Sequence, residues 1–190
     1  MGGDVNSNDG SEPSLASSRE EFKNTTPGYF KRGYEYWLMA EALKRNPNII
    51  LEGLQWGAPG WIGNGNFYSE ENAAFICAWL QGGKKYWNLD IKYVGIRNEV
   101  MYDKEYIKLL RKRLDKNGLQ NVIIDAGDLF QPHEKWLIAD DMLIDTELNK
   151  AIGVINSHTA EQTNYITTEN VRKINKPVWN GEAHFYGSNW

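Results

Sequence analysis

The sequence predicts an α/β fold, namely part of a (β/α)8 TIM barrel with about five strand–helix units, and three observations favour it. Short apolar runs alternate along the chain with longer stretches of helical periodicity, which is the pattern of βαβ units. The apolar runs are nearly continuous, as expected for parallel strands that are buried on both faces. No G-x-G-x-x-G motif follows any of these runs, so the barrel is favoured over a doubly wound dinucleotide-binding sheet.

The expected elements alternate in order. The expected strands are 49–56, 91–99, 122–128, 152–158 and 178–182. The expected helices are 27–46, 70–80, 103–114, 140–150 and 164–174. A Gly-rich loop is expected over 57–65, and Glu52 is an unusual residue for a buried strand.

Two of the helices have a recognisable apolar face. The helix over 103–114 places Ile107, Leu110 and Leu114 on one side, and Asn117-Gly118 ends it. The helix over 27–46 ends at Asn46-Pro47. Its apolar residues close to one face are Phe30, Tyr34, Trp37, Leu38 and Ala42.

The length of the chain indicates an incomplete barrel. Its 190 residues suffice for one domain with a core, but a complete barrel takes about 250 residues and eight strands. Residues 1–190 are therefore expected to form an incomplete catalytic barrel domain. Residues 1–26, which are rich in Gly, Ser, Asn and acidic groups, are expected to be an irregular loop.

Composition excludes several classes of function. A net charge of −4 argues against nucleic-acid binding. Cys77 is the only cysteine and the three histidines are scattered, so we expect neither a disulfide framework nor a metal site, and no cofactor. No G-x-S-x-G nucleophile motif is present. We also find no apolar run of about 18 residues and no signal-peptide pattern at the start.

The carboxyl end of each expected strand carries a polar or aromatic side chain, and such ends hold the catalytic groups of barrel enzymes. These residues are Trp56, Asn98, Glu99, Asp128, His158 and Glu182. Retaining glycoside hydrolysis needs two carboxyl groups about 5–5.5 Å apart, and Glu99 as acid/base and Glu182 as nucleophile would supply them. Asn98 would bind the sugar 2-hydroxyl. Alone, however, His158 is more typical of a hydrogen-bonded core histidine than of a catalyst, and Asn-Glu pairs are common on protein surfaces.

Eight tryptophans and ten tyrosines are many for a chain of this size. Aromatic faces stack on sugars, but a large aromatic core would account for the same composition. Longer motifs favour the sugar-related interpretation. They are Asp9–Pro13, Arg32–Glu35, Lys44–Asn48, Gly60-Trp61, Asp90-Ile91, Gly95–Glu99, Tyr106–Lys112 and Gly118–Gln120. Together these motifs resemble the galactocerebrosidase (galactosylceramidase) family of retaining glycoside hydrolases.

The resemblance implies a fold and a set of site residues. It implies that the chain covers the third to seventh strands of the barrel, with the acid/base after the fourth strand and the nucleophile after the seventh. Those positions match Glu99 and Glu182, while Asn98 matches a galactose-contacting Asn and Trp56 a Trp that lines the galactose pocket. The other candidate substrate-binding residues are Asn8, Asp128 and His158. No metal is implied.

The resemblance also implies a substrate and a setting. The substrates would be galactosylceramide and related galactosyl sphingolipids, a saposin-like protein would present the lipid, and the location would be lysosomal or secreted. Membrane lipid would be met only through the substrate. Asn24-Thr25-Thr26 matches a glycosylation sequon.

Four departures from the family pattern bear on specificity. Arg97 stands where the family has Trp, Asn8 where it has a galactose-contacting Thr, His158-Thr159-Ala160 where it has His-Tyr-Pro, and Asn180-Gly181 where it has two Ser. Hydrolysis is thus better supported than galactose specificity. Two alternatives stay open: an inactive barrel fragment that binds a sugar or a partner, and another clan-A β-glycosidase such as a glucosylceramidase-like enzyme.

Overall fold

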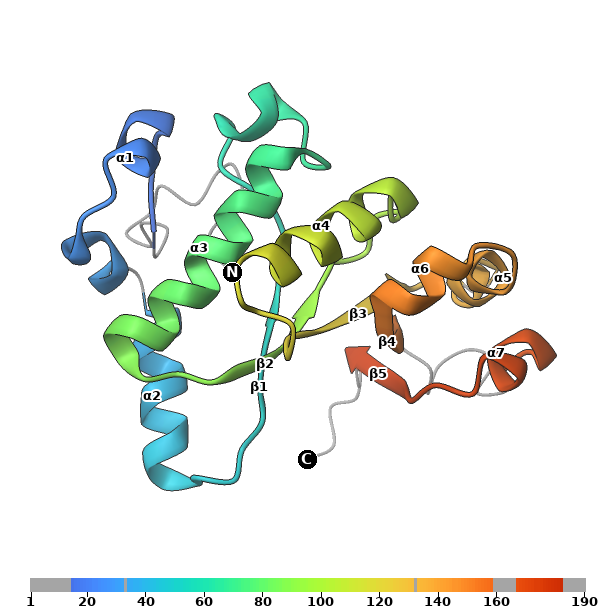
Figure 1. Ribbon diagram of the computed structural model, residues 1–190. Coiled ribbons are helices and arrows are strands. Elements are labelled where there is room, and N and C mark those ends of the chain that lie inside the picture. Colours follow the sequence, from blue (N-terminus) through green and yellow to red (C-terminus); the bar gives the residue numbers. More distant parts are fainter. Residues whose placement is uncertain (1–14, 33, 132, 159–166, 183–190) are drawn as a thin grey trace, which may run out of the picture.

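The chain folds into a five-stranded parallel sheet with helices on its outer side, as seen in a computed structural model (Figure 1). The structure describes residues 15–32, 34–131, 133–158 and 167–182. The strands lie in sequence order and are β1 (Leu51–Leu54), β2 (Ile91–Gly95), β3 (Ile123–Leu129), β4 (Ile152–His158) and β5 (Val178–Glu182). All four strand pairs are parallel. This is the partial α/β barrel that the sequence predicts.

Helices connect the strands. The α-helices are α1 (Arg19–Lys23), α2 (Glu35–Arg45), α3 (Glu70–Trp87), α4 (Lys104–Lys116), α5 (Leu137–Ile144), α6 (Thr146–Ala151) and α7 (Glu169–Ile174). Two 3-10 helices, η1 (Pro27–Lys31) and η2 (Ile62–Gly65), precede α2 and α3. None of the helices in the described ranges is long and apolar enough to cross a membrane.

The sheet is curled, and two aromatic side chains meet across its concave side. Tyr93 on β2 and Trp179 on β5 have ring centroids 4.6 Å apart. Their strands are three positions apart in the sheet, which is roughly 14 Å in a flat sheet. The contact therefore requires the curvature of a barrel wall.

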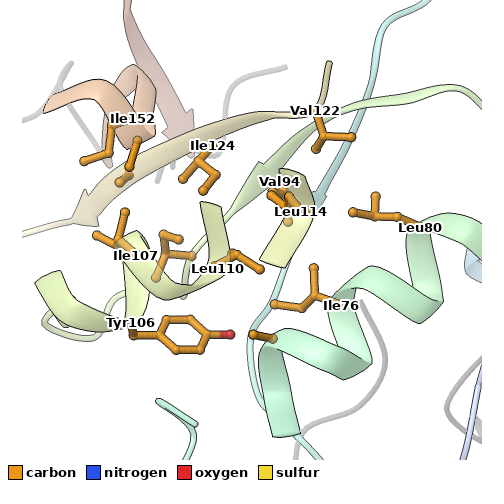
Figure 2. Close-up of a cluster of buried hydrophobic side chains, with 14 of the residues drawn as sticks. Ile76, Leu80, Val94, Tyr106, Ile107, Leu110, Leu114, Val122, Ile124 and Ile152 are labelled. Atoms are coloured by element: carbon orange, nitrogen blue, oxygen red, sulfur yellow. The ribbon is translucent and has the colours of Figure 1, made fainter. Parts of the chain in front are cut away.

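The hydrophobic core lies between the outer side of the sheet and helices α3 and α4. Figure 2 shows this cluster, with Ile107, Leu110 and Leu114 of α4 directed toward the strands. All three are fully buried, so the apolar face predicted for this helix is confirmed. The other labelled members are Ile76, Leu80, Val94, Tyr106, Val122, Ile124 and Ile152.

The prediction of one helix over 27–46 is wrong, both in the extent of the helix and in the face that is buried. The chain forms η1, turns after Lys31, and starts α2 at Glu35. The turn shifts the phase of the helix, so Tyr36 becomes its buried residue and donates a hydrogen bond to the carbonyl of Trp79 at 2.7 Å. Tyr34, Trp37 and Leu38 are exposed instead.

Helix α3 is longer than expected because its two glycines do not end it. A Cβ at Gly82 would lie 1.8 Å from the Phe30 ring, and one at Gly83 would lie 3.1 Å from the Tyr36 ring. These glycines let η1 and α2 pack directly on the helix. The helix continues to Trp87 and is terminated by Asn88 in the left-handed conformation.

Other boundaries also differ from the predictions. The loop expected over 1–26 contains α1, whose N-cap Ser18 accepts a hydrogen bond from the Glu21 amide. The helix expected over 140–150 is divided at Asp145, whose side chain caps α6 through the Leu148 amide. The first two strands are shorter than expected, while 152–158 and 178–182 agree with β4 and β5. Part of 164–174 lies outside the described residues, and α7 covers the rest of it from Glu169.

Candidate active site

The carboxyl ends of the strands bring four ionisable side chains to one edge of the sheet. Glu99 follows β2, Asp128 lies near the end of β3, and His158 and Glu182 are the last residues of β4 and β5. His158 and Glu182 are also partners in the strand register. Parallel strands explain this convergence, because their carboxyl ends all meet at the same edge.

His158 lies at the centre of this group and its side chain is fully buried. Its Nε2 atom is 2.6 Å from Oδ1 of Asp128. Its Nδ1 atom is 3.3 Å from Oε1 of Glu99 and 3.9 Å from Oε2 of Glu182. One imidazole therefore contacts a carboxylate from each of three other strand ends.

Burial alone would lower the pKa of His158, since the interior disfavours a charged ring. The carboxylates of Asp128, Glu99 and Glu182 act in the opposite direction and outweigh it, so the pKa is raised above its usual value. The imidazolium form is thereby favoured. Its positive charge lowers the repulsion among three carboxylates that lie close together.

The backbone at two of these residues adopts a conformation that is rare for residues other than glycine. Glu99 has φ 53° and Asp128 has φ 50°, both in the left-handed region. The Glu99 amide donates a hydrogen bond to the Asp128 carbonyl, and the Asn98 amide donates one to the Gln55 carbonyl, each at 3.1 Å. Non-glycine residues held this way cost roughly 1–2 kcal/mol each and are concentrated at functional sites.

The two carboxylates predicted to act in catalysis lie beside one another. One side-chain oxygen of Glu99 and one of Glu182 are within 4.8 Å of each other. Their side chains are 38% and 24% exposed, so a ligand can reach both. This spacing suits a pair that acts on opposite sides of one glycosidic bond in a retaining reaction.

The concave side of the sheet carries a second polar group that the sequence analysis did not identify as functional. The Asn156 side chain donates a hydrogen bond to Oδ1 of buried Asp125 at 3.1 Å. Burial raises the pKa of Asp125 to about 8, and the charge of Glu52 adds to this effect. The pKa of Glu52 is also raised, by partial desolvation of its carboxylate and by the charge of Asp128. The one sequence signal for this group was Glu52 within an apolar strand.

The other predicted site residues are placed as follows. Trp56 follows β1, is 63% exposed and lines a pocket with Arg97. Asn98 is half-buried, and its Oδ1 is a buried acceptor with no hydrogen-bond partner in the described ranges. Asn8 lies outside the described residues. The roles of these residues stay predictions.

Three of the strand-end residues could also bind a metal ion. Glu99, His158 and Glu182 each offer one ligand atom, and these atoms lie within 4.8 Å of one another. The sequence shows no metal-ligand spacing because the three residues come from three separate strand ends. Metal binding requires a neutral imidazole, whereas the surrounding carboxylates favour the imidazolium. A proton and a metal ion would therefore compete for His158, and the surrounding carboxylates attract both.

Parallel barrel strands with two facing carboxylates at their carboxyl ends define the class of barrel glycoside hydrolases. The comparisons identify the family within this class. A model of glycosyl hydrolase family 59 matches residues 1–189, and the chain belongs to this family.

Named relatives agree with this assignment. The chain is 42% identical over 191 residues to a galactocerebrosidase of Danio rerio, and 43% identical over 189 residues to one of Salmo salar. A putative galactocerebrosidase of Caenorhabditis elegans is 33% identical over 185 residues. Each match covers 97% of this chain but 26% of the relative. The chain thus spans about a quarter of the length of these relatives.

A solved structure supports the fold. SrfJ from Salmonella typhimurium superposes with a TM-score of 0.62, covering 77% of this chain and 38% of that protein. The sequence identity is 17%, so this likeness concerns the fold alone.

Proposed function

We propose that this chain carries the catalytic centre of a retaining β-galactosidase that hydrolyses galactosylceramide-type glycosphingolipids. The observation that carries the proposal is the pair Glu99 and Glu182, whose oxygens lie within 4.8 Å at the carboxyl edge of the sheet. The substrate class rests on the name galactocerebrosidase that the relatives bear.

The reaction takes place in two steps. In the first, Glu182 attacks the anomeric carbon while Glu99 donates a proton to the glycosidic oxygen, so ceramide leaves and a covalent galactosyl-enzyme forms. In the second, Glu99 removes a proton from water, which displaces Glu182 and restores the carboxylate. Two inversions at one carbon retain the β configuration in the product.

The neighbouring residues bind and orient. Asn98, which directly precedes Glu99, hydrogen-bonds the sugar 2-hydroxyl with its side-chain amide, and such hydrogen bonds strengthen in the transition state. Trp56, which is largely exposed, offers an aromatic face to the sugar ring. His158, held by Asp128 at 2.6 Å, positions both catalytic carboxylates with its Nδ1 side.

The setting follows from the same substrate class. A galactosyl sphingolipid is largely apolar, so a saposin-like protein that lifts it from the bilayer is the partner we propose, with a lysosomal or secreted location. The chemistry as written uses only carboxylates and water, and needs no metal.

Two other candidates have an observation in their favour. In the described ranges, β1 and β5 each pair with one neighbour, which favours a barrel piece that binds a sugar or a partner without turnover. Another β-glycosidase, glucosylceramidase-like, is the second candidate, because the two-carboxylate mechanism does not itself select galactose.

Hydrolysis of aryl β-galactoside and aryl β-glucoside distinguishes these candidates. We would assay the chain itself and a chimera in which residues 1–190 replace the matching segment of the Danio rerio galactocerebrosidase, to which they are 42% identical. We expect the chimera to prefer the galactoside, to release the β anomer first by NMR, and to keep its rate in EDTA.

Each contrary result has a distinct meaning. Initial release of the α anomer would contradict the retaining mechanism, and loss of activity in EDTA would indicate a metal at Glu99, His158 and Glu182. Preference for the glucoside would support the second alternative. A folded chimera that binds galactosides without turnover would support the first. In the chimera, Glu182→Gln should abolish turnover, and Glu147→Gln, whose exposed side chain lies on α6, is the matched control.

A further inference from the structure

Arg97 directly precedes Asn98 and Glu99 in the chain, and its side chain is half-buried. Its guanidinium carbon lies 4.2 Å from the centroid of the Phe67 ring and 5.6 Å from that of Tyr68. The planar cation is thus held against two aromatic side chains, which fixes its position. The galactocerebrosidase family, as noted above, has Trp at this position.

The charge of Arg97 has no acidic partner in the part of the chain that the structure describes. Its Nε atom is buried and makes no hydrogen bond there. The hydroxyl of Tyr68, with which the guanidinium does interact, is neutral. Five of the six other arginines in this part do pair with a carboxylate: Arg19 with Glu71, Arg32 with Glu21, Arg45 with Glu41, Arg111 with Asp115 and Arg113 with Glu70. The sixth, Arg172, donates to the Thr167 carbonyl.

Arg97 also lines a pocket, and Trp56 and Phe67 form parts of the same wall. The volume of the pocket is about 190 Å³. Pockets for whole ligands measure roughly 300–1,000 Å³, so this one suits a single substituent rather than a complete sugar. Trp56 belongs both to this wall and to the proposed sugar site, which places the pocket beside the sugar.

We propose that this pocket binds an anionic substituent, a sulfate ester or a carboxylate, on the glycoside that Glu99 and Glu182 process. A guanidinium presents paired N–H donors in one plane, which match the oxygens of such a group. The apolar side chains of Ile62 and Phe67 in the lining strengthen the attraction by excluding water. The inference rests on the proposed function and extends it to acidic galactosides.

The test is a set of binding measurements on the chain by calorimetry or NMR titration. The ligands are methyl β-galactoside, its 3-sulfate, its 6-sulfate and methyl β-galacturonide. We expect at least one anionic ligand to bind about tenfold or more tightly than the neutral one at low salt. This advantage should shrink between 50 and 500 mM NaCl, while neutral binding stays constant.

Substitutions assign the effect to this residue. Arg97→Met keeps an apolar stem against Phe67 but removes the charge, and should abolish the anionic advantage without changing affinity for methyl β-galactoside. Arg45→Met, at an exposed side chain near the end of α2, is the control and should leave every affinity unchanged. Should Arg97→Met unfold the chain, Arg97→Gln removes the same charge and should likewise abolish the anionic advantage.

Three results would overturn the inference. Equal binding of neutral and anionic galactosides would remove it while leaving the proposed function intact. An equal loss for all ligands in Arg97→Met would show that Arg97 serves packing only. Failure of every galactoside to bind the folded chain would contradict this inference and the proposed function together.

Discussion

At the scale of single residues, the burial of Asp125 makes the stability of the fold depend on pH. Its pKa in the fold, about 8, lies above the ~3.9 of an unfolded aspartate, so the folded state keeps a proton that the unfolded chain has lost. Stability from this group is therefore full at low pH and is lost as pH rises toward 8. The pKa of His158 is also raised, so this residue likewise lowers the stability of the fold as the pH rises above about 6.5.

The first prediction is that the chain becomes less stable as the pH rises. Between pH 5 and 8, Asp125 alone should lower the free energy of unfolding by up to ~1.4 kcal/mol per pH unit. Asp125→Asn removes the titrating group and should flatten much of this slope, whereas Asp115→Asn on α4 should not. Urea unfolding at each pH measures it. A slope that is identical in the unaltered chain and in Asp125→Asn would show that Asp125 is ionised in the fold.

Gly181 provides a second prediction at this scale. A Cβ at this position would lie 2.4 Å from Oδ1 of Asn156, which is buried and hydrogen-bonded to Asp125. Gly181→Ala must displace that side chain and should cost about 1–3 kcal/mol in urea unfolding. Gly28→Ala meets its nearest atom at 3.6 Å and serves as the control. Equal stability of the two variants would mean that Asn156 moves freely.

At the scale of elements, α4 depends on the cap at its start. The Asp103 side chain accepts a hydrogen bond from the Tyr106 amide at 2.8 Å, where the helix dipole also favours a negative charge. Asp103→Ala should lower the free energy of unfolding by about 1 kcal/mol, while Asp103→Ser keeps an acceptor and most of that stability. If both variants lost the same amount, the cap would not explain the effect.

Some elements could be predicted from sequence because their signals are local. The apolar run of β4 ends sharply at polar residues, and Ile107, Leu110 and Leu114 repeat with the period of a helix. The break before α2 could not be predicted in this way, because it depends on Phe30 and Tyr36 packing against distant α3.

In the candidate site, too, local features could be predicted from the sequence and long-range contacts could not. The sequence predicted each strand-end residue separately, since polar groups after apolar runs are visible locally. It did not predict that His158 contacts Glu99, Asp128 and Glu182, or that Asn156 binds Asp125. Those contacts depend on strand register and on the curvature of the sheet, which involve residues far apart in the chain.

At the scale of the molecule, the described part of the sheet has five strands in a fold that closes with eight. Unpaired strand edges favour association, and a 1 Å displacement of a catalytic group can cost about 100-fold in rate. We therefore expect the isolated chain to scatter light on unfolding and to turn over aryl β-galactoside at least ~100-fold more slowly than the chimera. A monodisperse, cooperative and fully active chain would contradict this.

Covalent labelling of the chimera tests the assignment of Glu99 and Glu182 most directly. A 2-deoxy-2-fluoro-galactosyl donor with an activated leaving group should label the peptide that contains Glu182, as read by mass spectrometry after digestion. Glu182→Gln should give no label. Glu99→Gln should still be labelled, because the leaving group needs no proton, and azide should restore its turnover. Label on another residue, or identical behaviour of the two variants, would contradict the proposed mechanism.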